Sequence, residues 1–394
     1  MIIFRTLNKF INSNMKKALI WIVVIGLVIW GLSSVAGKSK VNTTTSNEAN
    51  KTAPVKIGFV GPLTGDASSM GVPANKAVQL AIKEVNDAGG INGRKIELIT
   101  EDGKCNTKAG SDAGAKLISA DKVTAIIGGL CSGETSAFGP NAMQNKVVTI
   151  SYLSSSPALS NLGKYFFRNY PSDTFQGAYA ADYVFNKLGK KKVAVVYSNT
   201  DWGTGVKTVF VEKFKSLGGT IVLDEGVTQD ARDFRTVLSK VKSSGAEFAF
   251  VPMYNESAVP FLKQVKESGI KIGILGGDAW ADTKLQEQVD GTLGAMYVEV
   301  KTGTSDEFSN KFTTMFPGEK VSVGTAQAYD ATNILLNALK KIGTENPDAL
   351  AEEIRSVKYN GVSGYIAFGP TGDMTEASYL VKKLLGNGKV EEVK

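Results

Sequence analysis

The stretch KVTAIIGGLCSG (122–133) combines an apolar run, a glycine turn and the first residues of a helix. The run does not alternate polar with apolar residues, which is typical of a strand that is buried on both faces of a parallel sheet. The helical stretch 134–145 follows directly. A buried strand, a short loop and a helix in this order form one repeat of an α/β fold.

The same repeat recurs on both sides of this stretch. Helical spacing of apolar residues separates the runs, as at Ala77, Leu80, Ala81 and Val85. Such βαβ alternation predicts doubly wound sheets, in which ligands bind at the carboxyl ends of the strands. The other strand-like runs are VKIGFVG (55–61), RKIELITED (94–102), KVVTIS (146–151), KVAVVYS (192–198), EFAFVPM (247–253) and KIGILGG (271–277).

Composition narrows the possible functions. The 394 residues are enough for two α/β lobes, and 43% hydrophobic against 21% charged residues indicates a globular chain. The formal charge of +7 comes almost entirely from residues 1–40, because without them 39 basic side chains face 38 acidic ones. This balance argues against nucleic-acid binding. Histidine is absent, which disfavours most hydrolase and zinc-site chemistry.

The N-terminal region predicts export. An apolar run covers residues 18–36 and directly follows Lys16 and Lys17. It suits either a signal peptide that is cleaved after Ala36 or a retained membrane anchor, so residues 1–36 are interpreted as one of these two. The start at Met1 or at Met15 also stays open. Residues 37–53 are polar and predict a flexible linker.

Cys105 and Cys131 are the two cysteines of the chain, and both follow the export segment. An even pair in an oxidising compartment favours a disulfide; two buried free thiols are the alternative. No G-x-G-x-x-G follows the first strand, and no G-x-x-x-x-G-K-[ST] occurs, so a nucleotide enzyme is disfavoured. We expect no enzyme activity, no cofactor and no metal site.

Six blocks occur in order along the body of the chain. They are GFVGPLTGDASSMG (58–71), NDAGGINGRKIELITEDGKC (86–105), IIGGLCSG (126–133), ISYLSSSPALS (150–160), YSNTDWGTG (197–205) and GILGGDAWAD (273–282). Together these blocks resemble the branched-chain amino-acid-binding (Leu/Ile/Val-binding) family of periplasmic binding proteins, the substrate-binding proteins of ABC transporters.

The resemblance implies the periplasmic-binding-protein type I fold. In this fold two Rossmann-like lobes with doubly wound parallel sheets are joined by three crossover strands. Each lobe is then discontinuous in sequence. We expect lobe 1 to comprise residues 54–172 plus 301–357, and lobe 2 residues 173–300 plus 358–388.

The resemblance also implies a site for the carboxylate of a free amino acid. Ser132 matches the family's carboxylate-binding serine at the start of a helix, where first-turn N–H groups favour an anion. Ser154 matches a residue that offers its carbonyl to the ammonium, and Ser155 one that offers its hydroxyl to the carboxylate. A helix cap and a serine-rich turn are the structural alternatives.

Four further residues complete the expected site. Asp278 matches the family's acidic partner of the ligand ammonium, often Glu, with a turn-forming Asp as the alternative. Trp202 matches an aromatic position and, as an exposed loop residue, would stack on the ligand. Met70 and Met253 fall where relatives place pocket-wall aromatics, although either is equally suited to the core.

The expected function is capture of a branched-chain or related amino acid outside the cytoplasmic membrane and delivery to the permease subunits of an ABC importer. One alternative is the ligand-binding module of a membrane sensor. Another is a binder of a related amide or aromatic acid, because the ligand's identity is not readable from these motifs.

Overall fold

The computed structural model describes residues 53–301 and 303–394. The expected leader, residues 1–36, and residues 37–52 of the expected linker lie outside the described residues. Among the helices that are described, none is both long and apolar enough to cross a membrane.

Lobe 1 is built on a five-stranded parallel sheet in the order β2-β1-β3-β4-β5. β3 and β4 are buried along their whole length, as their unbroken apolar runs predict. The strands are β1 (Val55–Gly61), β2 (Ile96–Asp102), β3 (Ala125–Ile127), β4 (Val148–Ser151) and β5 (Phe166–Arg168).

Helices cover both faces of this sheet. Ile57 and Phe59 point to the face that packs on α3 and α12, whereas Val60 and Ile126 point to the face that packs on α5. This division follows from the two-residue period of a strand. The helices of lobe 1 are α3 (Ser68–Asp87), α4 (Thr107–Ala115), α5 (Ser132–Gln144), α11 (Asp306–Met315), α12 (Thr325–Ile342) and α13 (Pro347–Arg355).

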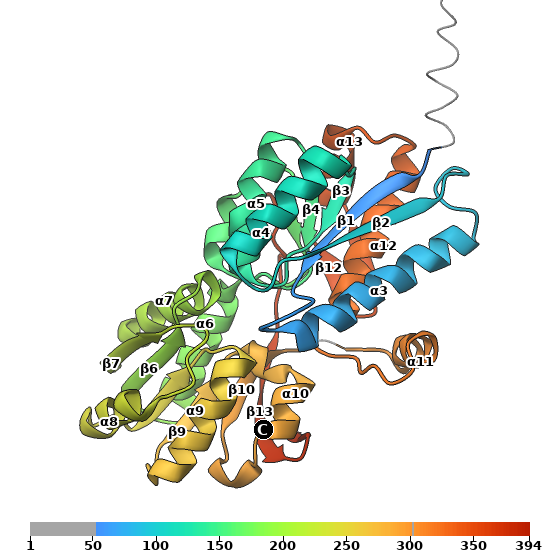
Figure 1. Cartoon of the computed structure of the whole chain (residues 1–394). Helices are drawn as coiled ribbons and strands as arrows, with labels where there is room; N and C mark the ends of the chain where they lie inside the picture. The colour runs from blue at the N-terminus through green and yellow to red at the C-terminus, as the bar shows by residue number, and fades with distance from the viewer. Residues whose placement is uncertain (1–52, 302) are drawn as a thin grey trace, which may run out of the picture. The chain divides into compact units, whose positions relative to one another are not determined.

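Lobe 2 is built on a seven-stranded sheet in the order β14-β13-β10-β9-β8-β6-β7 (Figure 1). The strands from β6 to β10 are parallel, but β13 and β14 are antiparallel to their neighbours. The sheet is therefore not wholly parallel, because the chain re-enters lobe 2 from the opposite direction and closes with a hairpin. The strands are β6 (Lys192–Ser198), β7 (Thr220–Val227), β8 (Phe248–Val251), β9 (Gly273–Gly276), β10 (Met296–Val300), β13 (Tyr379–Gly386) and β14 (Lys389–Glu392).

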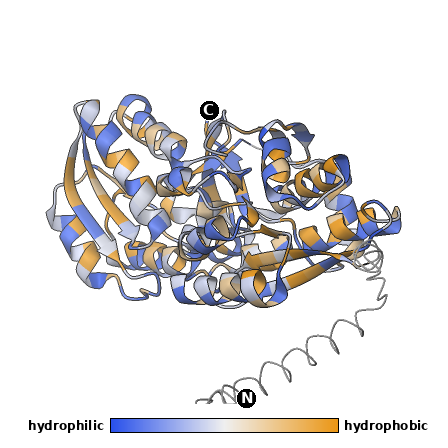
Figure 2. Cartoon of the chain, turned by 90° about the horizontal axis from the view of Figure 1, so that it is seen from above, coloured by the Kyte–Doolittle hydropathy of each residue, from blue (hydrophilic) through white to orange (hydrophobic). Residues whose placement is uncertain are grey.

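The second sheet also has two helical layers. Phe250 in β8 stacks on Phe210 of α7 with ring centroids 4.2 Å apart, while Val251 faces α8 and α9. Figure 2 shows hydrophobic residues along the strands, whereas the outer helices alternate between hydrophobic and hydrophilic residues. The helices are α6 (Asp173–Asp182), α7 (Asp201–Ser216), α8 (Arg235–Ser243), α9 (Asn255–Ser268) and α10 (Thr283–Gln288).

A two-stranded hairpin, β11 (Lys358–Gly361) and β12 (Gly364–Ala367), lies beside lobe 1. The carboxylate of Asp330 in α12 accepts hydrogen bonds from the amides of Val362 and Ser363, at 3.0 and 2.7 Å. The expected lobe boundary at 357/358 precedes this hairpin. We propose that the third crossover between the lobes follows this hairpin and lies between Met374 and β13.

The predicted disulfide between Cys105 and Cys131 is present, with Cα atoms 5.2 Å apart. One carboxylate holds both halves of it: Glu134 accepts the amides of Cys105 at 2.8 Å and of Cys131 at 3.0 Å. Burial nevertheless raises the pKa of Glu134 to about 7. The disulfide and this carboxylate together connect the loop after β2 to the start of α5.

Replacing both Cys105 and Cys131 with Ala should lower the free energy of unfolding by about 3 kcal/mol, because the unfolded chain then loses a closed loop. Urea denaturation of the purified protein measures this. Treating the wild type with reductant should give the same loss. Equal unfolding free energies for the oxidised wild type and the variant would contradict the prediction.

Candidate functional site

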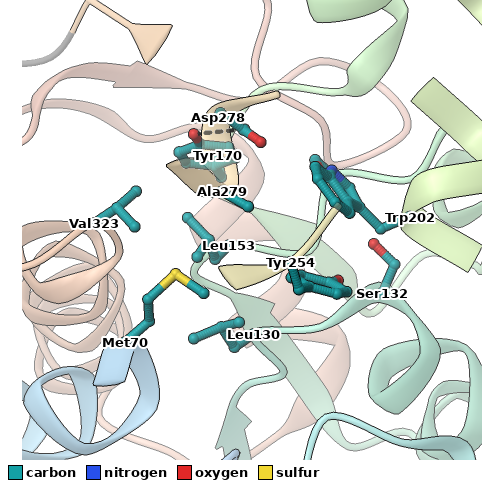
Figure 3. Close-up of a pocket in the computed structure, with 11 residues that line it drawn as sticks. Met70, Leu130, Ser132, Leu153, Tyr170, Trp202, Tyr254, Asp278, Ala279 and Val323 are labelled. Atoms are coloured by element: carbon teal, nitrogen blue, oxygen red, sulfur yellow. Dashed lines mark hydrogen bonds between the residues drawn. The ribbon is translucent and has the colours of Figure 1, made fainter. Parts of the chain in front are cut away.

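A narrow pocket lies between the two lobes. It is found where strands of both sheets reach their carboxyl ends, as the doubly wound fold predicts. Figure 3 shows Asp278 and Tyr170 at one end, with Ser132 and Trp202 on one side and Met70 and Val323 on the other. Its lining residues are Met70, Leu130, Ser132, Leu153, Ser155, Tyr170, Trp202, Tyr254, Asp278, Ala279 and Val323.

Ser132 and Ser155 form the polar part of the pocket that belongs to lobe 1. Ser132 is the first residue of α5, and its hydroxyl accepts the amide of Ser156 at 3.1 Å. The carbonyl of Ser155 accepts the amide of Asp173 at 2.8 Å. A helix N-terminus next to two buried hydroxyls favours an anionic group, because the first-turn N–H groups carry partial positive charge.

Ser154 does not line the pocket. Its hydroxyl lies 2.7 Å from Oγ1 of Thr135 and 3.1 Å from the carbonyl oxygen of Gly129, and its own carbonyl lies 3.4 Å from Nη1 of Arg168. The carbonyl that was expected to face an ammonium therefore faces a guanidinium. Ser154 holds the loop together rather than presenting a polar group to the pocket.

Arg168 is fully buried and holds the loop of residues 154–160 in place through hydrogen bonds. Nη1 donates to the carbonyl of Ser156 at 2.8 Å, and Nη2 donates to the hydroxyl of Ser160 at 2.8 Å. Nε pairs with Asp373 at 2.6 Å, so the charge is neutralised within the protein. The planar guanidinium thus connects the loop of the site to the segment after the β11–β12 hairpin.

Asp278 supplies the acidic end of the pocket from lobe 2. It follows β9 and is only 5% exposed. The hydroxyl of Tyr170 donates to its Oδ2 at 2.8 Å. The side-chain amide of Gln176 accepts the backbone amide of Asp278 at 3.0 Å and donates to Oδ1 of Asp173 at 2.8 Å. Gln176 therefore connects Asp173 to Asp278, and the carboxyl groups of these two residues are hereafter called the carboxyl pair.

The carboxyl pair resists full ionisation. Burial raises the pKa of Asp278 to about 6, although the hydrogen bonds from Tyr170 and Gln176 oppose the shift. Burial and repulsion from Asp278 raise the pKa of Asp173 well above its ordinary value. No cation of the described protein pairs with Asp278. The pair is therefore suited to receive positive charge from a ligand.

Aromatic rings close one side of the pocket. Trp202 was expected on an exposed loop, but it lies in the first turn of α7 and is 3% exposed. Its ring centroid is 4.7 Å from that of Tyr254. Met253 does not line the pocket: it packs in the core of lobe 2, and its carbonyl accepts Nε1 of Trp280 at 3.0 Å. The next residue, Tyr254, takes the place expected for Met253.

The rest of the wall is apolar. Met70 reaches the pocket from the first turn of α3 and also packs in the core of lobe 1. Leu130, Leu153 and Val323 come from three different loops of lobe 1. These side chains offer no hydrogen bonds, so this region suits an aliphatic or aromatic group. Over residues 53–301 and 303–394, no group of three or more His, Cys, Asp or Glu is placed to hold a metal ion.

Several pocket residues were missed from the sequence. Tyr170 lines the pocket and follows β5, a strand that is absent from the predicted set. The carboxyl-end rule that identified the other loops applies equally to this strand. Val323 precedes α12, far along the chain, and no local signal places it in the site.

The two lobes and the interlobe pocket define a ligand-binding protein that encloses a small molecule. Residues 54–388 match the family described as periplasmic binding protein, and the chain belongs to this family. It is accordingly a solute-binding protein rather than an enzyme, and it works outside the cytoplasm. The type I fold predicted from the sequence is confirmed.

Individual relatives give the same assignment. An amino acid binding protein of Pseudomonas aeruginosa is 27% identical over 376 residues, which cover 93% of this chain and 98% of that protein. The branched-chain amino acid transporter substrate-binding protein LivJ of Streptococcus pneumoniae, solved with isoleucine, is 28% identical with a TM-score of 0.75. That match covers 86% of this chain and 99% of LivJ.

A third relative was solved with a different ligand. It is a solute-binding protein of an ABC transporter from Rhodopseudomonas palustris, in complex with 3,4-dihydroxybenzoic acid. It is 26% identical, with a TM-score of 0.74, and the match covers 84% of this chain and 93% of that one. Relatives at similar identity thus bind an amino acid and an aromatic acid, so the ligand must be argued from the pocket itself.

Replacing Arg168 with Met should lower the free energy of unfolding by about 3–5 kcal/mol, because Asp373 and two buried carbonyl groups lose their partner. Urea denaturation is the measurement. Lys164→Met is the control, since it removes an exposed partner of Asp348 and should leave the midpoint nearly unchanged. An unchanged midpoint for Arg168→Met would show that the guanidinium does not stabilise the loop.

Proposed function

We propose that this protein captures a free amino acid with a compact aliphatic side chain and delivers it to the permease of an ABC importer. The observation that carries the proposal is Asp278, a buried carboxyl group at one end of the pocket that forms an ion pair with no cation among the described residues. A zwitterion supplies the ammonium that such a site needs. A charge-assisted hydrogen bond in a closed pocket then gives both affinity and orientation.

Each part of the ligand has a partner in this scheme. The ammonium binds Asp278, with Asp173 behind it. The carboxylate binds the hydroxyls of Ser132 and Ser155 and the N-terminus of α5. The side chain contacts Met70, Leu130, Leu153 and Val323, whose apolar surfaces favour a branched aliphatic group. Trp202 and Tyr254 exclude water from the other side.

An aromatic acid is the second candidate, supported by the rings of Trp202 and Tyr254 and by the relative that binds a dihydroxybenzoate. Its carboxylate also suits Ser132. It has no cation, however, so the carboxyl pair would be buried against a neutral ring without compensation. The electrostatics therefore favour an amino acid over an aromatic acid.

Closure of the two lobes around the ligand links binding to transport. A ligand that contacts both lobes stabilises the closed shape, and a permease that recognises this shape receives only loaded protein. The relatives serve transporters, which favours this role over that of a sensor module. We further propose that residues 1–36 direct export, whether they are cleaved or retained as an anchor.

A thermal-shift panel tests the proposed ligand class. Leucine, isoleucine or valine at 100 times its dissociation constant should stabilise the fold by about 2.7 kcal/mol. Leucinamide, which lacks the carboxylate, and benzoate, which lacks the ammonium, should give much smaller shifts at the same concentration. Stabilisation by benzoate or 3,4-dihydroxybenzoate alone would instead establish the aromatic-acid candidate.

Asp278→Asn should weaken leucine binding by about 30-fold or more while the ligand-free protein melts at nearly the same temperature. The variant keeps the shape of the side chain but not its charge. In the wild type, affinity should fall as the pH is lowered through about 6, because the raised pKa makes Asp278 neutral there. Calorimetry from pH 8 to pH 5 measures both effects. An equally steep pH profile in Asp278→Asn would mean that another group titrates.

A further inference from the structure

The two lobes also touch outside the pocket, where the first turn of α3 meets the first turn of α9. The backbone amide of Ala67 in lobe 1 donates to Oε1 of Glu256 in lobe 2 at 3.0 Å. One residue earlier in lobe 2, Nδ2 of Asn255 donates to the hydroxyl of Ser69 at 3.3 Å. These bonds join positions more than a hundred residues apart in the chain, and they must break if the lobes separate.

A third lobe-2 residue joins the same contact. Asp282 accepts the hydroxyl of Ser322 in lobe 1 at 3.4 Å and also interacts with the hydroxyl of Ser69. We name this contact the latch. It consists of Asn255, Glu256 and Asp282 on lobe 2 and of Ala67, Ser69 and Ser322 on lobe 1.

Glu256 makes the strongest bond of the latch because α3 has no cap of its own. The N-cap residue is Ala67, whose side chain accepts no hydrogen bond, and the first turn of this 20-residue helix contains no acidic residue. The positive end of the helix dipole therefore faces lobe 2 without a side-chain cap from its own helix. A carboxylate is the complement that such a helix end lacks.

Other contacts between the lobes outside the pocket are weaker. Nε2 of Gln229 lies 3.3 Å from both Oδ2 of Asp66 and the carbonyl of Cys105, and Arg232 lies 3.6 Å from Asp66. Lys320 and Glu287 form an ion pair in which both side chains are largely exposed. Among these contacts outside the pocket, the partly buried carboxylate of Glu256 on a helix end is therefore the one whose loss should matter most.

The latch adjoins the pocket without lining it. Met70 lies one residue after Ser69, and Tyr254 lies one residue before Asn255; both line the pocket. Asp278 and Ala279, which also line the pocket, precede the latch residue Asp282 by a single short helical turn. The hydrogen bond between Glu256 and Ala67 therefore fixes the distance between the pocket wall of lobe 1 and the pocket wall of lobe 2.

We propose that Glu256 is a positioning residue that keeps the lobes closed and thereby slows ligand release without touching the ligand. Oε2 of Glu256 is buried with no hydrogen-bond partner among the described residues, and Asp66 and Asp282 both lie near this carboxyl. Both features reduce the net stabilisation of the closed lobes. The contact therefore remains reversible, as delivery of a ligand requires.

The test is the kinetics of leucine binding to Glu256→Ala, measured by stopped flow. Release needs an open cleft, so the dissociation rate should rise about tenfold, while the association rate of the open form stays within about twofold. Glu256→Gln keeps an acceptor for Ala67 and should show a smaller rise. Glu267→Ala removes an exposed carboxylate from the same helix and should match the wild type. An unchanged dissociation rate in Glu256→Ala would overturn the proposal.

A second measurement does not depend on the proposed ligand. With Lys320→Cys and Glu287→Cys introduced together, a short bismaleimide bridges the lobes only when they are closed. Adding Glu256→Ala should slow this crosslinking about tenfold in ligand-free protein, whereas Glu267→Ala should not. Equal crosslinking rates would refute the latch. A wild type that binds no amino acid would instead refute the proposed function and leave this comparison valid.

Discussion

The carboxyl pair is the constraint on which the site depends. Two carboxyl groups are buried at the junction of the lobes, and the nearby buried cation, Arg168, is already paired with Asp373. Removing a carboxylate from water without a counter-charge is costly, and proton uptake is the alternative to an incoming cation. Tyr170 and Gln176 do not remove this cost, but they fix the geometry at which a cation is received. In the proposed function, selectivity for an amine thus arises because Asp278 lacks a counter-charge from the protein.

Much of the fold and part of the site could be predicted because they depend on local patterns. Unbroken apolar runs identify buried strands, and the ends of those strands lead to Ser132, Ser155 and Asp278. The family resemblance placed Met253 in the pocket wall, but its side chain packs in the core of lobe 2, because only the path of the chain after β8 decides which side chain turns toward the pocket. Trp202 was placed near the pocket but on the wrong kind of segment: the first turn of α7 already includes it.

Contacts between distant segments could not be predicted in this way. The sequence around Glu256 does not indicate that this side chain contacts the start of α3, almost two hundred residues earlier in the chain. The sequence around Ser154 likewise does not indicate that its carbonyl faces Arg168. The antiparallel strands β13 and β14 likewise follow from the direction in which the chain returns to lobe 2. Such features depend on tertiary arrangement, which a single sequence does not reveal through periodicity or turn residues.

The repeated crossing between lobes also has a consequence for how the chain folds. In lobe 1, α12 packs beside α3 and the sheet, although the two helices lie at opposite ends of the chain (Figure 1). In lobe 2, Val298 of β10 pairs with Val381 of β13. Neither lobe can complete its core before the C-terminal residues have been synthesised. High contact order of this kind slows folding. A chain that stays unfolded until its synthesis is complete can still pass through a membrane channel.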